Sequence, residues 1–438
     1  MKLCGRRLAL PNRQTVTAAD PARLIGNTSP PHPSNVWISK RWGIAAAAFI
    51  LQIALGAVYA WSVFRIPLSQ KFGWSAAQVT VTFTISVSVD SVACFFGGLW
   101  LNRMGPRVVA QTGGLLYGLG VFLASFSRLG LGWLYLTYGL MGGAGIGLAF
   151  IVPVTVLVKW FPDRRGLISG ISVAGFGSGA LITAPVATRL IETVGVLNTF
   201  AYLGIAYLVI SMGAGFFMQN PPDGWQPAGW TPSPAQARQR SVKDFTLREA
   251  LATWQWWALW TLLFLNTCAG IALISQEAPL FETLAAISAG VAGGMLGVAS
   301  LGNSAGRIFW AWASDGMTRR WTFAVMFLLE CALFWILPSL AAAGVITAVS
   351  FVILSCYGGA FGIMPAFTAD YFGSRNVGPI YGLIATAWGA AAAFGPLLLA
   401  ETLKSSGSYT SGLHIISAIM AFSSLLPVFL RPPQPKAV

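Results

Sequence analysis

The feature that most constrains this chain is a series of long apolar stretches separated by short hydrophilic gaps. A helix needs about 20 apolar residues to cross the hydrocarbon core of a bilayer, and about twelve stretches of that kind can be placed along the chain. Only helices and closed barrels span lipid, and these runs are too long and uniform for the alternating pattern of barrel strands. The sequence therefore predicts an all-α integral membrane protein. The expected spans are 43–64, 78–101, 108–126, 133–158, 167–190, 198–218, 255–276, 288–312, 321–341, 346–369, 379–401 and 413–430.

The composition excludes two other classes of protein. Only 9% of the residues are charged, whereas a soluble domain carries about 25%, so the chain cannot cover a water-facing surface. The net charge of +14 does not indicate a nucleic-acid partner, because the basic residues lie in the short gaps rather than in one patch. We expect the lipid bilayer to surround the chain, and no nucleic acid to bind it.

Cysteine and histidine are too sparse and scattered for a metal centre. Four of the five cysteines fall inside apolar stretches, and the chain has only two histidines, His32 and His414. No nucleophile–base pair can be argued from the sequence. We therefore expect no enzymatic activity, no metal and no cofactor.

The distribution of Lys and Arg predicts the orientation in the membrane. With the N-terminus inside, 21 of the 27 Lys and Arg residues fall in inside segments, 5 fall outside, and Arg307 lies within a span. Cytoplasmic loops carry the excess of positive charge, which puts both termini in the cytoplasm. Arg6 and Arg7 are followed by only three apolar residues before Pro11, too few for a signal peptide. The Ala- and Gly-rich composition favours a bacterial inner (plasma) membrane.

A hydrophilic stretch near the middle divides the chain. It opens at Asn220 with two prolines and ends with Thr246 and Glu249, whose spacing is that of a capping box and predicts a short helix at the membrane surface. The expected segments are a disordered cytoplasmic tail (1–41), an N-terminal six-helix bundle (42–218), a cytoplasmic linker with the short surface helix (219–253), a C-terminal six-helix bundle (254–430) and a cytoplasmic tail (431–438).

The two predicted bundles share an internal repeat. Phe161 and Phe372 lie 211 residues apart, and so do Pro185 and Pro396. Two parallel six-helix halves of this kind place a substrate site at their interface, near the middle of the membrane.

Four motifs resemble a known family. The segment 98–107 (GLWLNRMGPR) resembles the loop signature of the major facilitator superfamily between its second and third helices. The segments 159–166 (KWFPDRRG), 56–64 (GAVYAWSVF) and 220–225 (NPPDGW) resemble the oxalate/formate antiporter family, which is related to the monocarboxylate transporters. The resemblance covers about residues 40–430. It implies the major facilitator fold, with two pseudo-symmetric six-helix bundles, and transport of a small organic anion.

The resemblance also implies a gating loop at two corresponding places. The superfamily normally has an Asp where Asn102 stands, whereas the second-half counterpart, Asp315, is kept. That Asp resembles a hinge between the halves, so the departure affects the first-half side of the gate. The residues expected in the gate are Gly98, Asn102, Arg103, Gly105, Arg107, Asp315, Arg319 and Arg320.

Arg307 is the leading candidate for a substrate-binding residue. A charge at the bilayer centre costs about 2.5–3.5 kcal/mol on insertion scales, so such residues are functional candidates. A guanidinium presents a planar fork that matches a carboxylate. The alternative is a structural pair with an acid on a neighbouring helix. The predicted span places Arg307 about five residues from the inner end of its helix.

The resemblance adds further residues to the expected site. In the oxalate-carrying members an Arg in helix eight and a Lys in helix eleven hold the dianion; Arg307 matches the Arg, and Trp388 stands where the Lys would be. The monocarboxylate transporters have an Asp where Asn303 stands, and a Lys in helix one near Tyr59. In the family arrangement Tyr59, Trp61 and Trp388 would face the cavity; the alternative for each is helix packing or a place in an interfacial aromatic belt.

Two acids also lie within predicted spans. Asp90 lies in the middle of the second span, where a buried carboxylate can carry a proton, and the alternative is a pair or hydrogen bond to another helix. Glu330 belongs to an outer helix, for which we expect a structural or snorkelling role.

These observations favour a secondary active transporter that moves a small monocarboxylate, such as pyruvate, lactate or formate, by alternating access. With one intramembrane cation near the site, a monoanion is better matched than a dianion. An oxalate/formate-type dicarboxylate exchanger is the alternative, and a non-transporting anion sensor is an alternative from another class. Coupling to protons and exchange for a counter-anion both stay open.

Overall fold

The computed structural model describes residues 35–434 except 233, 242, 286 and 288, and these residues form helices and connecting turns without a strand. The first half contains α1 (Asn35–Gly56), η2 (Ala57–Trp61), α2 (Ser62–Phe72), α3 (Ala76–Met104), α4 (Pro106–Leu123), η3 (Ala124–Leu129), α5 (Leu131–Leu134), η4 (Tyr135–Gly142), α6 (Gly143–Trp160), α7 (Arg165–Val194) and α8 (Val196–Phe216). The linker contains α9 (Pro234–Gln239) and α10 (Leu247–Leu251). The second half contains α11 (Trp254–Ala285), α12 (Ala289–Met317), α13 (Arg319–Ile336), η5 (Leu337–Ser339), α14 (Ala343–Phe372), α15 (Val377–Ile384), α16 (Thr386–Ser406), α17 (Tyr409–Ser423) and α18 (Leu426–Phe429).

The helices are long and apolar enough to cross a membrane. Within the described residues, 11 spans meet both conditions, several of them built from consecutive elements, such as Lys40–Phe72 from α1, η2 and α2. The 29-residue helix α12 stands where the eighth span is predicted. The prediction of an all-α membrane fold is therefore confirmed.

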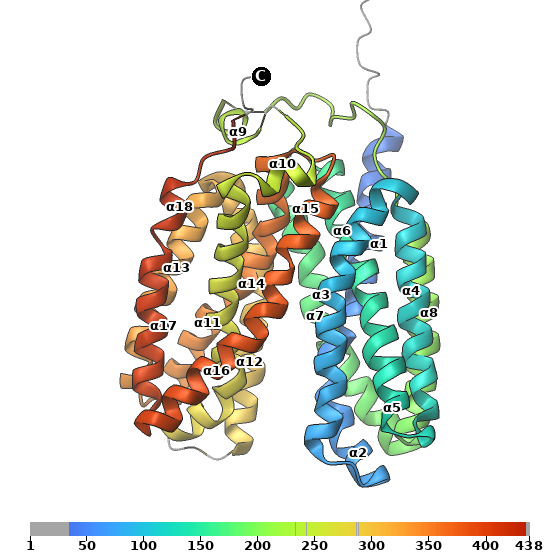
Figure 1. Ribbon diagram of the computed structural model, residues 1–438, viewed down its shortest axis with the longest axis vertical. Coiled ribbons are helices and arrows are strands. Elements are labelled where there is room, and N and C mark those ends of the chain that lie inside the picture. Colours follow the sequence, from blue (N-terminus) through green and yellow to red (C-terminus); the bar gives the residue numbers. More distant parts are fainter. Residues whose placement is uncertain (1–34, 233, 242, 286, 288, 435–438) are drawn as a thin grey trace, which may run out of the picture.

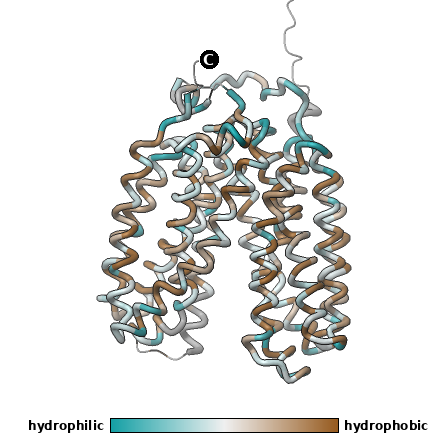
Figure 2. Tube along the Cα trace, in the orientation of Figure 1, coloured by the Kyte–Doolittle hydropathy of each residue, from teal (hydrophilic) through white to brown (hydrophobic). Residues whose placement is uncertain are grey.

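The helices form two bundles (Figure 1). One contains α1 to α8 and the other α11 to α18, and the linker passes over one end of both. The bundles approach each other near the linker and diverge toward the opposite end (Figure 1). Apolar residues follow the helices along their length, whereas hydrophilic residues gather at the linker end (Figure 2).

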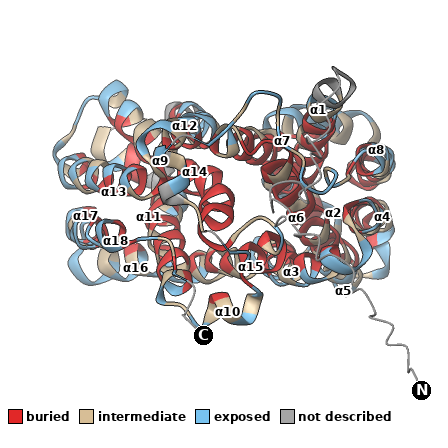
Figure 3. Ribbon diagram, turned by 90° about the horizontal axis from the view of Figure 1, so that it is seen from above, coloured by how far each residue is buried: buried red, intermediate tan, exposed pale blue. Residues whose placement is uncertain are grey.

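The interface between the bundles is made by a few central helices. α7 packs against α12 and α14, and α3 packs against α15. Seen from the linker end, buried residues concentrate on α6, α7 and α14 at the centre of the molecule (Figure 3). Glycines allow this approach: a Cβ built at Gly170 on α7 would clash with the carbonyl oxygen of Arg307, and one at Gly98 on α3 with that of Gly378.

Single residues make the tight turns at the linker end. α3 continues to Met104, so three of the expected gating-loop residues (Gly98, Asn102 and Arg103) are helical, and Gly105 alone forms the turn, with φ 81°. In the second half Thr318 forms the corresponding turn between α12 and α13, with φ 82°. The gating segments are therefore helix ends rather than a loop, because the helical hydrogen bonds continue past the apolar stretch.

The linker has the capping box that its sequence predicts. The Thr246 hydroxyl accepts from the Glu249 amide at 3.3 Å, and the Glu249 carboxylate accepts from the Thr246 amide at 2.8 Å. These bonds satisfy the free amides at the start of α10. A second short helix, α9, was not predicted. The expected disordered tail of residues 1–41 needs correction at its end, because α1 already begins at Asn35; residues 1–34 and 435–438 lie outside the described part of the chain.

Candidate functional site

A small cavity lies at the interface of the two bundles. Its volume is about 30 Å³, room for roughly two water-sized spheres, so only a compact ligand fits it in this conformation. Four of the lining elements come from the first bundle (η2, α3, α6 and α7), and the others from the second. The lining residues are Tyr59, Asp90, Ser91, Cys94, Phe150, Val173, Phe176, Arg307, Phe361, Tyr381, Ala385 and Trp388.

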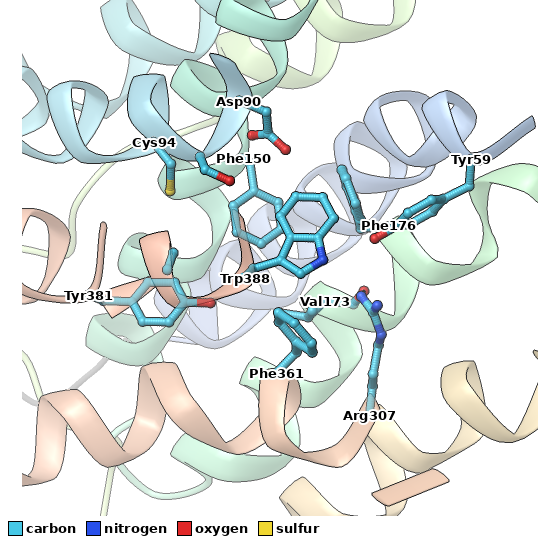
Figure 4. Close-up of a pocket in the computed structure, with 12 residues that line it drawn as sticks. Tyr59, Asp90, Cys94, Phe150, Val173, Phe176, Arg307, Phe361, Tyr381 and Trp388 are labelled. Atoms are coloured by element: carbon cyan, nitrogen blue, oxygen red, sulfur yellow. The ribbon is translucent and has the colours of Figure 1, made fainter. Parts of the chain in front are cut away.

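Arg307 reaches this cavity from α12 (Figure 4). Its side chain is only 2% exposed, and it contacts neutral groups: Nη1 donates to the Val173 carbonyl at 2.9 Å, and Nε donates to Oδ1 of Asn303 at 3.2 Å. The Phe361 ring centre lies 5.5 Å from its Cζ. Among the described residues no ion pair includes Arg307, so the structural pair that was the alternative reading has no acid there.

The depth of Arg307 differs from the sequence prediction. α12 ends at Met317, so Arg307 lies ten residues from that end rather than about five. The apolar stretch ends earlier than the helix does. The Ser314 hydroxyl donates to the carbonyl of Ala311 within the helix, and polar residues of this kind extend the helix beyond the stretch that hydropathy detects.

Tyr59 and Trp388 both line the cavity, where they face each other from opposite bundles. Their ring centres are 6.4 Å apart, and Tyr59 also packs edge-to-face on Phe176 at 5.3 Å. Sequence reasoning did not single out four further rings of this wall, because their helices are apolar on every side. These rings belong to Phe150, Phe176, Phe361 and Tyr381.

Trp61 does not line the cavity, and its expected place there was wrong. It is 4% exposed and packs inside the first bundle, with its ring centre 4.4 Å from that of Tyr138 and 6.0 Å from that of Phe64. Residues two apart on a helical turn point in different directions, so Tyr59 and Trp61 cannot face the same cavity.

The two intramembrane acids lie in different surroundings. Asp90 on α3 is 6% exposed and lines the cavity, and no hydrogen bond or ion pair of its carboxylate occurs within the described residues. Arg307 and Asp90 thus bring opposite charges to the cavity from opposite bundles. Glu330 is buried inside the second bundle instead, where Nδ2 of Asn266 contacts both carboxylate oxygens at 3.2 and 3.1 Å.

Asp315 joins the bundles at the linker end. Its carboxylate accepts hydrogen bonds from the amides of Gly166 and Leu167, both at 2.9 Å, at the start of α7 in the other bundle. Arg319 contacts the same carboxylate at 2.7 Å. Since the N-terminus of a helix attracts negative charge, Asp315 caps α7 and closes this end of the interface.

A cluster of charges around Asp370, which sequence reasoning missed, adds to this closure. Asp370, near the end of α14, pairs with Arg165 of the first bundle at 2.9 Å and with Arg319 at 3.0 Å. Arg240 of the linker lies 3.5 Å from the same carboxylate and donates to the carbonyl of Pro162 at 2.8 Å. The linker therefore contacts both bundles. The sequence signal that could have revealed this cluster is an acidic residue, Asp370, directly after a predicted apolar span.

The corresponding first-half contact is uncharged. Asn102 donates to the side chain of Asn376 across the interface at 3.1 Å. Within the described part of the chain, three other basic residues expected in the gate form no hydrogen bond or ion pair between the bundles. Arg107 stacks on Phe216, Arg320 donates to the Leu430 carbonyl, and Arg103 lines a polar cavity at the linker end.

Comparison with known proteins agrees with this geometry. The Major Facilitator Superfamily model matches residues 42–396 and 286–438. The chain is 29% identical to the oxalate:formate antiporter of Oxalobacter formigenes, over 90% of this chain and 92% of that protein. It is 30% identical to an uncharacterized MFS-type transporter of Escherichia coli (strain K12), over 82% of this chain and 87% of that protein.

The chain is also similar to a monocarboxylate transporter over part of its length and to a solved transporter structure in fold. Monocarboxylate transporter 13 of Rattus norvegicus is 30% identical over 43% of this chain and 42% of that protein. The crystal structure of the fucose:proton symporter of E. coli superposes with a TM-score of 0.63 at 14% identity, over 88% of this chain and 98% of that chain, which shows the fold alone. The chain thus belongs to the Major Facilitator Superfamily and is an integral membrane transporter, not an enzyme.

Proposed function

We propose that this transporter moves a small organic monoanion across the membrane by alternating access, with Arg307 as the residue that binds the carboxylate. The observation that carries the proposal is a buried guanidinium in a cavity between the bundles, held only by neutral acceptors. Asn303 and the Val173 carbonyl occupy two of its five N–H donors. The guanidinium has further N–H donors, and a carboxylate can accept two such donors in a bidentate arrangement.

The charge of the cavity favours a monoanion. Arg307 is the cation among the lining residues, and Asp90 brings a carboxylate to the same cavity. A second carboxylate on the substrate would have no cation to meet. Similarity to an oxalate:formate antiporter and to a monocarboxylate transporter supports a carboxylate as the transported group. Pyruvate, lactate and formate fit this description better than oxalate.

Asp90 supplies a means of coupling. When its carboxylate is charged, Arg307 and Asp90 together make the cavity neutral, and an entering anion is repelled by Asp90. Because charges interact strongly in a low-dielectric site, protonation of Asp90 favours anion binding. We infer that a proton accompanies the anion; exchange for a counter-anion is the competing mode.

The proposed orientation places the linker in the cytoplasm. The linker and the end of the second bundle lie at the same end of the molecule (Figure 1), and most Lys and Arg residues fall in the segments assigned to that side. With both termini in the cytoplasm of a bacterial inner membrane, the closed end of the interface is the cytoplasmic one. The conformation described here then faces outward.

Uptake of radiolabelled pyruvate, lactate, formate and oxalate into proteoliposomes tests the proposal. Arg307→Ala is expected to abolish uptake of the transported anion, whereas Arg189→Ala, which removes an exposed guanidinium from α7, is the matched control and keeps it. Uptake by Arg307→Ala equal to that of the wild type would disprove the anion-binding role. Binding without uptake would indicate the sensor alternative.

The driving force is tested in the same vesicles. Under the proton-coupled mode an inward proton gradient accelerates uptake by the wild type, and Asp90→Asn loses this acceleration. If uptake instead requires a preloaded anion and ignores the gradient, the protein is an exchanger. Exchange of oxalate for formate in this arrangement would establish the dicarboxylate alternative.

A further inference from the structure

The hydroxyl of Tyr381 is a polar group without a partner at the wall of the central cavity. Tyr381 lies on α15, its side chain is 0% exposed, and its Oη has no hydrogen-bond partner within the described residues. It lines the same cavity as Arg307. In Figure 4 the hydroxyl points toward the side of the cavity where Trp388 and Phe361 lie.

Two other buried tyrosines differ from Tyr381 in this respect. The hydroxyl of Tyr117 donates to the carbonyl of Ala54 at 3.0 Å, and that of Tyr207 forms a hydrogen bond with Thr183 at 3.1 Å. This is the usual outcome, because leaving a buried hydroxyl unpaired costs free energy. Tyr381 therefore stands out as a buried hydroxyl that lines the cavity unpaired.

The backbone around Tyr381 is held in place. The neighbouring Gly382 approaches the carbonyl of Cys94 on α3, so that a Cβ there would lie 2.8 Å from that oxygen. The helix breaks after Ile384, and Thr386, just beyond the break, accepts a hydrogen bond from Trp260 at 3.1 Å. These contacts hold the segment of backbone that carries the Tyr381 ring at the wall of the cavity.

We propose that the Tyr381 hydroxyl is a specificity-determining donor, which hydrogen-bonds an uncharged oxygen of the substrate while Arg307 binds its carboxylate. The substrate class is then a monocarboxylate that also carries a hydroxyl or carbonyl group. A neutral hydroxyl suits a neutral oxygen, and Asp90 on the same cavity disfavours a second carboxylate. The inference rests on the proposed function. An analogue that lacks this oxygen would leave the buried hydroxyl without a hydrogen bond. A site of this kind therefore discriminates strongly against such analogues.

The test compares substrates of similar shape with the variant Tyr381→Phe, which removes only the hydroxyl. Uptake of lactate, pyruvate and propionate is measured in proteoliposomes, because propionate lacks the additional oxygen. The wild type is expected to prefer lactate or pyruvate over propionate. In Tyr381→Phe the KM for the preferred acid is expected to rise about tenfold, while that for propionate stays within about twofold, so the preference collapses.

Tyr117→Phe is the matched control, because it removes a buried hydroxyl that is not part of the cavity lining, and it is expected to keep the wild-type preference. Three outcomes would overturn the inference: an equal loss of uptake for all three acids in Tyr381→Phe, no change of uptake in that variant, or a wild type that transports propionate as well as lactate. None of these outcomes would contradict the proposal that the protein transports a carboxylate. If the wild type moves no carboxylate, the proposed function fails as well.

Discussion

Arg307 on α12 donates a hydrogen bond of 2.9 Å to the backbone carbonyl of Val173 on α7, so the proposed anion-binding side chain also joins the two bundles. The two roles share one guanidinium group. A carboxylate that binds its other donors and displaces the group weakens a contact that holds the bundles together in this conformation. Binding of the substrate and movement of the bundles are thereby linked through one side chain.

The first prediction separates the charge of Arg307 from its shape. Arg307→Lys keeps a positive charge but loses the planar fork and the reach to both Val173 and Asn303. We expect the KM of the transported anion to rise at least about tenfold, a loss of about 1.4 kcal/mol of binding free energy. Initial uptake rates over a range of substrate concentrations measure this. A KM equal to that of the wild type would mean that charge alone suffices.

The second prediction concerns the close approach of α7 and α12. A Cβ at Gly170 would clash with the carbonyl oxygen of Arg307, whereas one at Gly213 on α8 meets nothing within 4 Å. Gly170→Ala is expected to push the bundles apart on the linker side and to raise the accessibility of a cysteine introduced there. Labelling with a membrane-impermeant thiol reagent in inverted vesicles measures this, and Gly213→Ala serves as the control. Equal labelling of the two variants would contradict the clash.

The third prediction tests the charge cluster at the linker end. Asp370→Asn leaves the guanidinium groups of Arg165 and Arg319 without their shared partner, and removing one partner of a buried pair costs about 3–5 kcal/mol. We expect the closed linker side to open and net uptake to fall. Distances between spin labels on the two bundles report the opening. Asp163→Asn, which breaks the pair with Arg41, is the control and should leave these distances unchanged.

The sequence was sufficient for the fold because hydropathy, charge and repeats each constrain it over the whole chain. The lengths of the apolar stretches predict the helices, and the offset that relates Phe161 to Phe372 predicts two related halves. The positions of the helix ends were predicted less accurately. α12 extends to Met317 because its last turns are polar but still helical, and a hydropathy pattern does not detect such turns.

The site was predicted where a residue type is unusual for its position and, for Tyr59 and Trp388, through the family resemblance. Arg307 and Asp90 are charges within apolar spans, and both line the cavity. Tyr381 and Phe361 are ordinary in such spans, and only the packing of the bundles brings them to the cavity. Trp61 was misplaced because the expectation did not use its spacing from Tyr59; residues two apart on a helical turn point in different directions.

The fourth prediction concerns the linker and pH. Hydrogen bonds from Lys243, and then from the Thr246 amide and hydroxyl, lower the pKa of Glu249 from its ordinary 4.5 to about 2. A lowered pKa means that the charged carboxylate stabilises α10 above pH of about 4.5, and that this stabilisation is lost as pH falls toward 2. The carboxyl carbon shift of Glu249, followed by NMR in nanodiscs, should titrate with a midpoint near 2. Lys243→Ala should move the midpoint upward; a wild-type midpoint near 4.5 would contradict these bonds.

The fifth prediction concerns the turn at Thr318, whose φ of 82° is the positive value that Gly105 adopts at the corresponding turn. A β-branched residue is strained in this region, at a cost of about 1–3 kcal/mol, whereas glycine adds about 0.5–1 kcal/mol of chain entropy in the unfolded state. The Thr318 hydroxyl has no hydrogen-bond partner within the described residues, so little is lost with the side chain. Thr318→Gly is therefore expected to raise the midpoint of thermal unfolding in detergent, and Gly105→Thr to lower it. A lower midpoint for Thr318→Gly would mean that packing of the side chain outweighs the strain of the backbone.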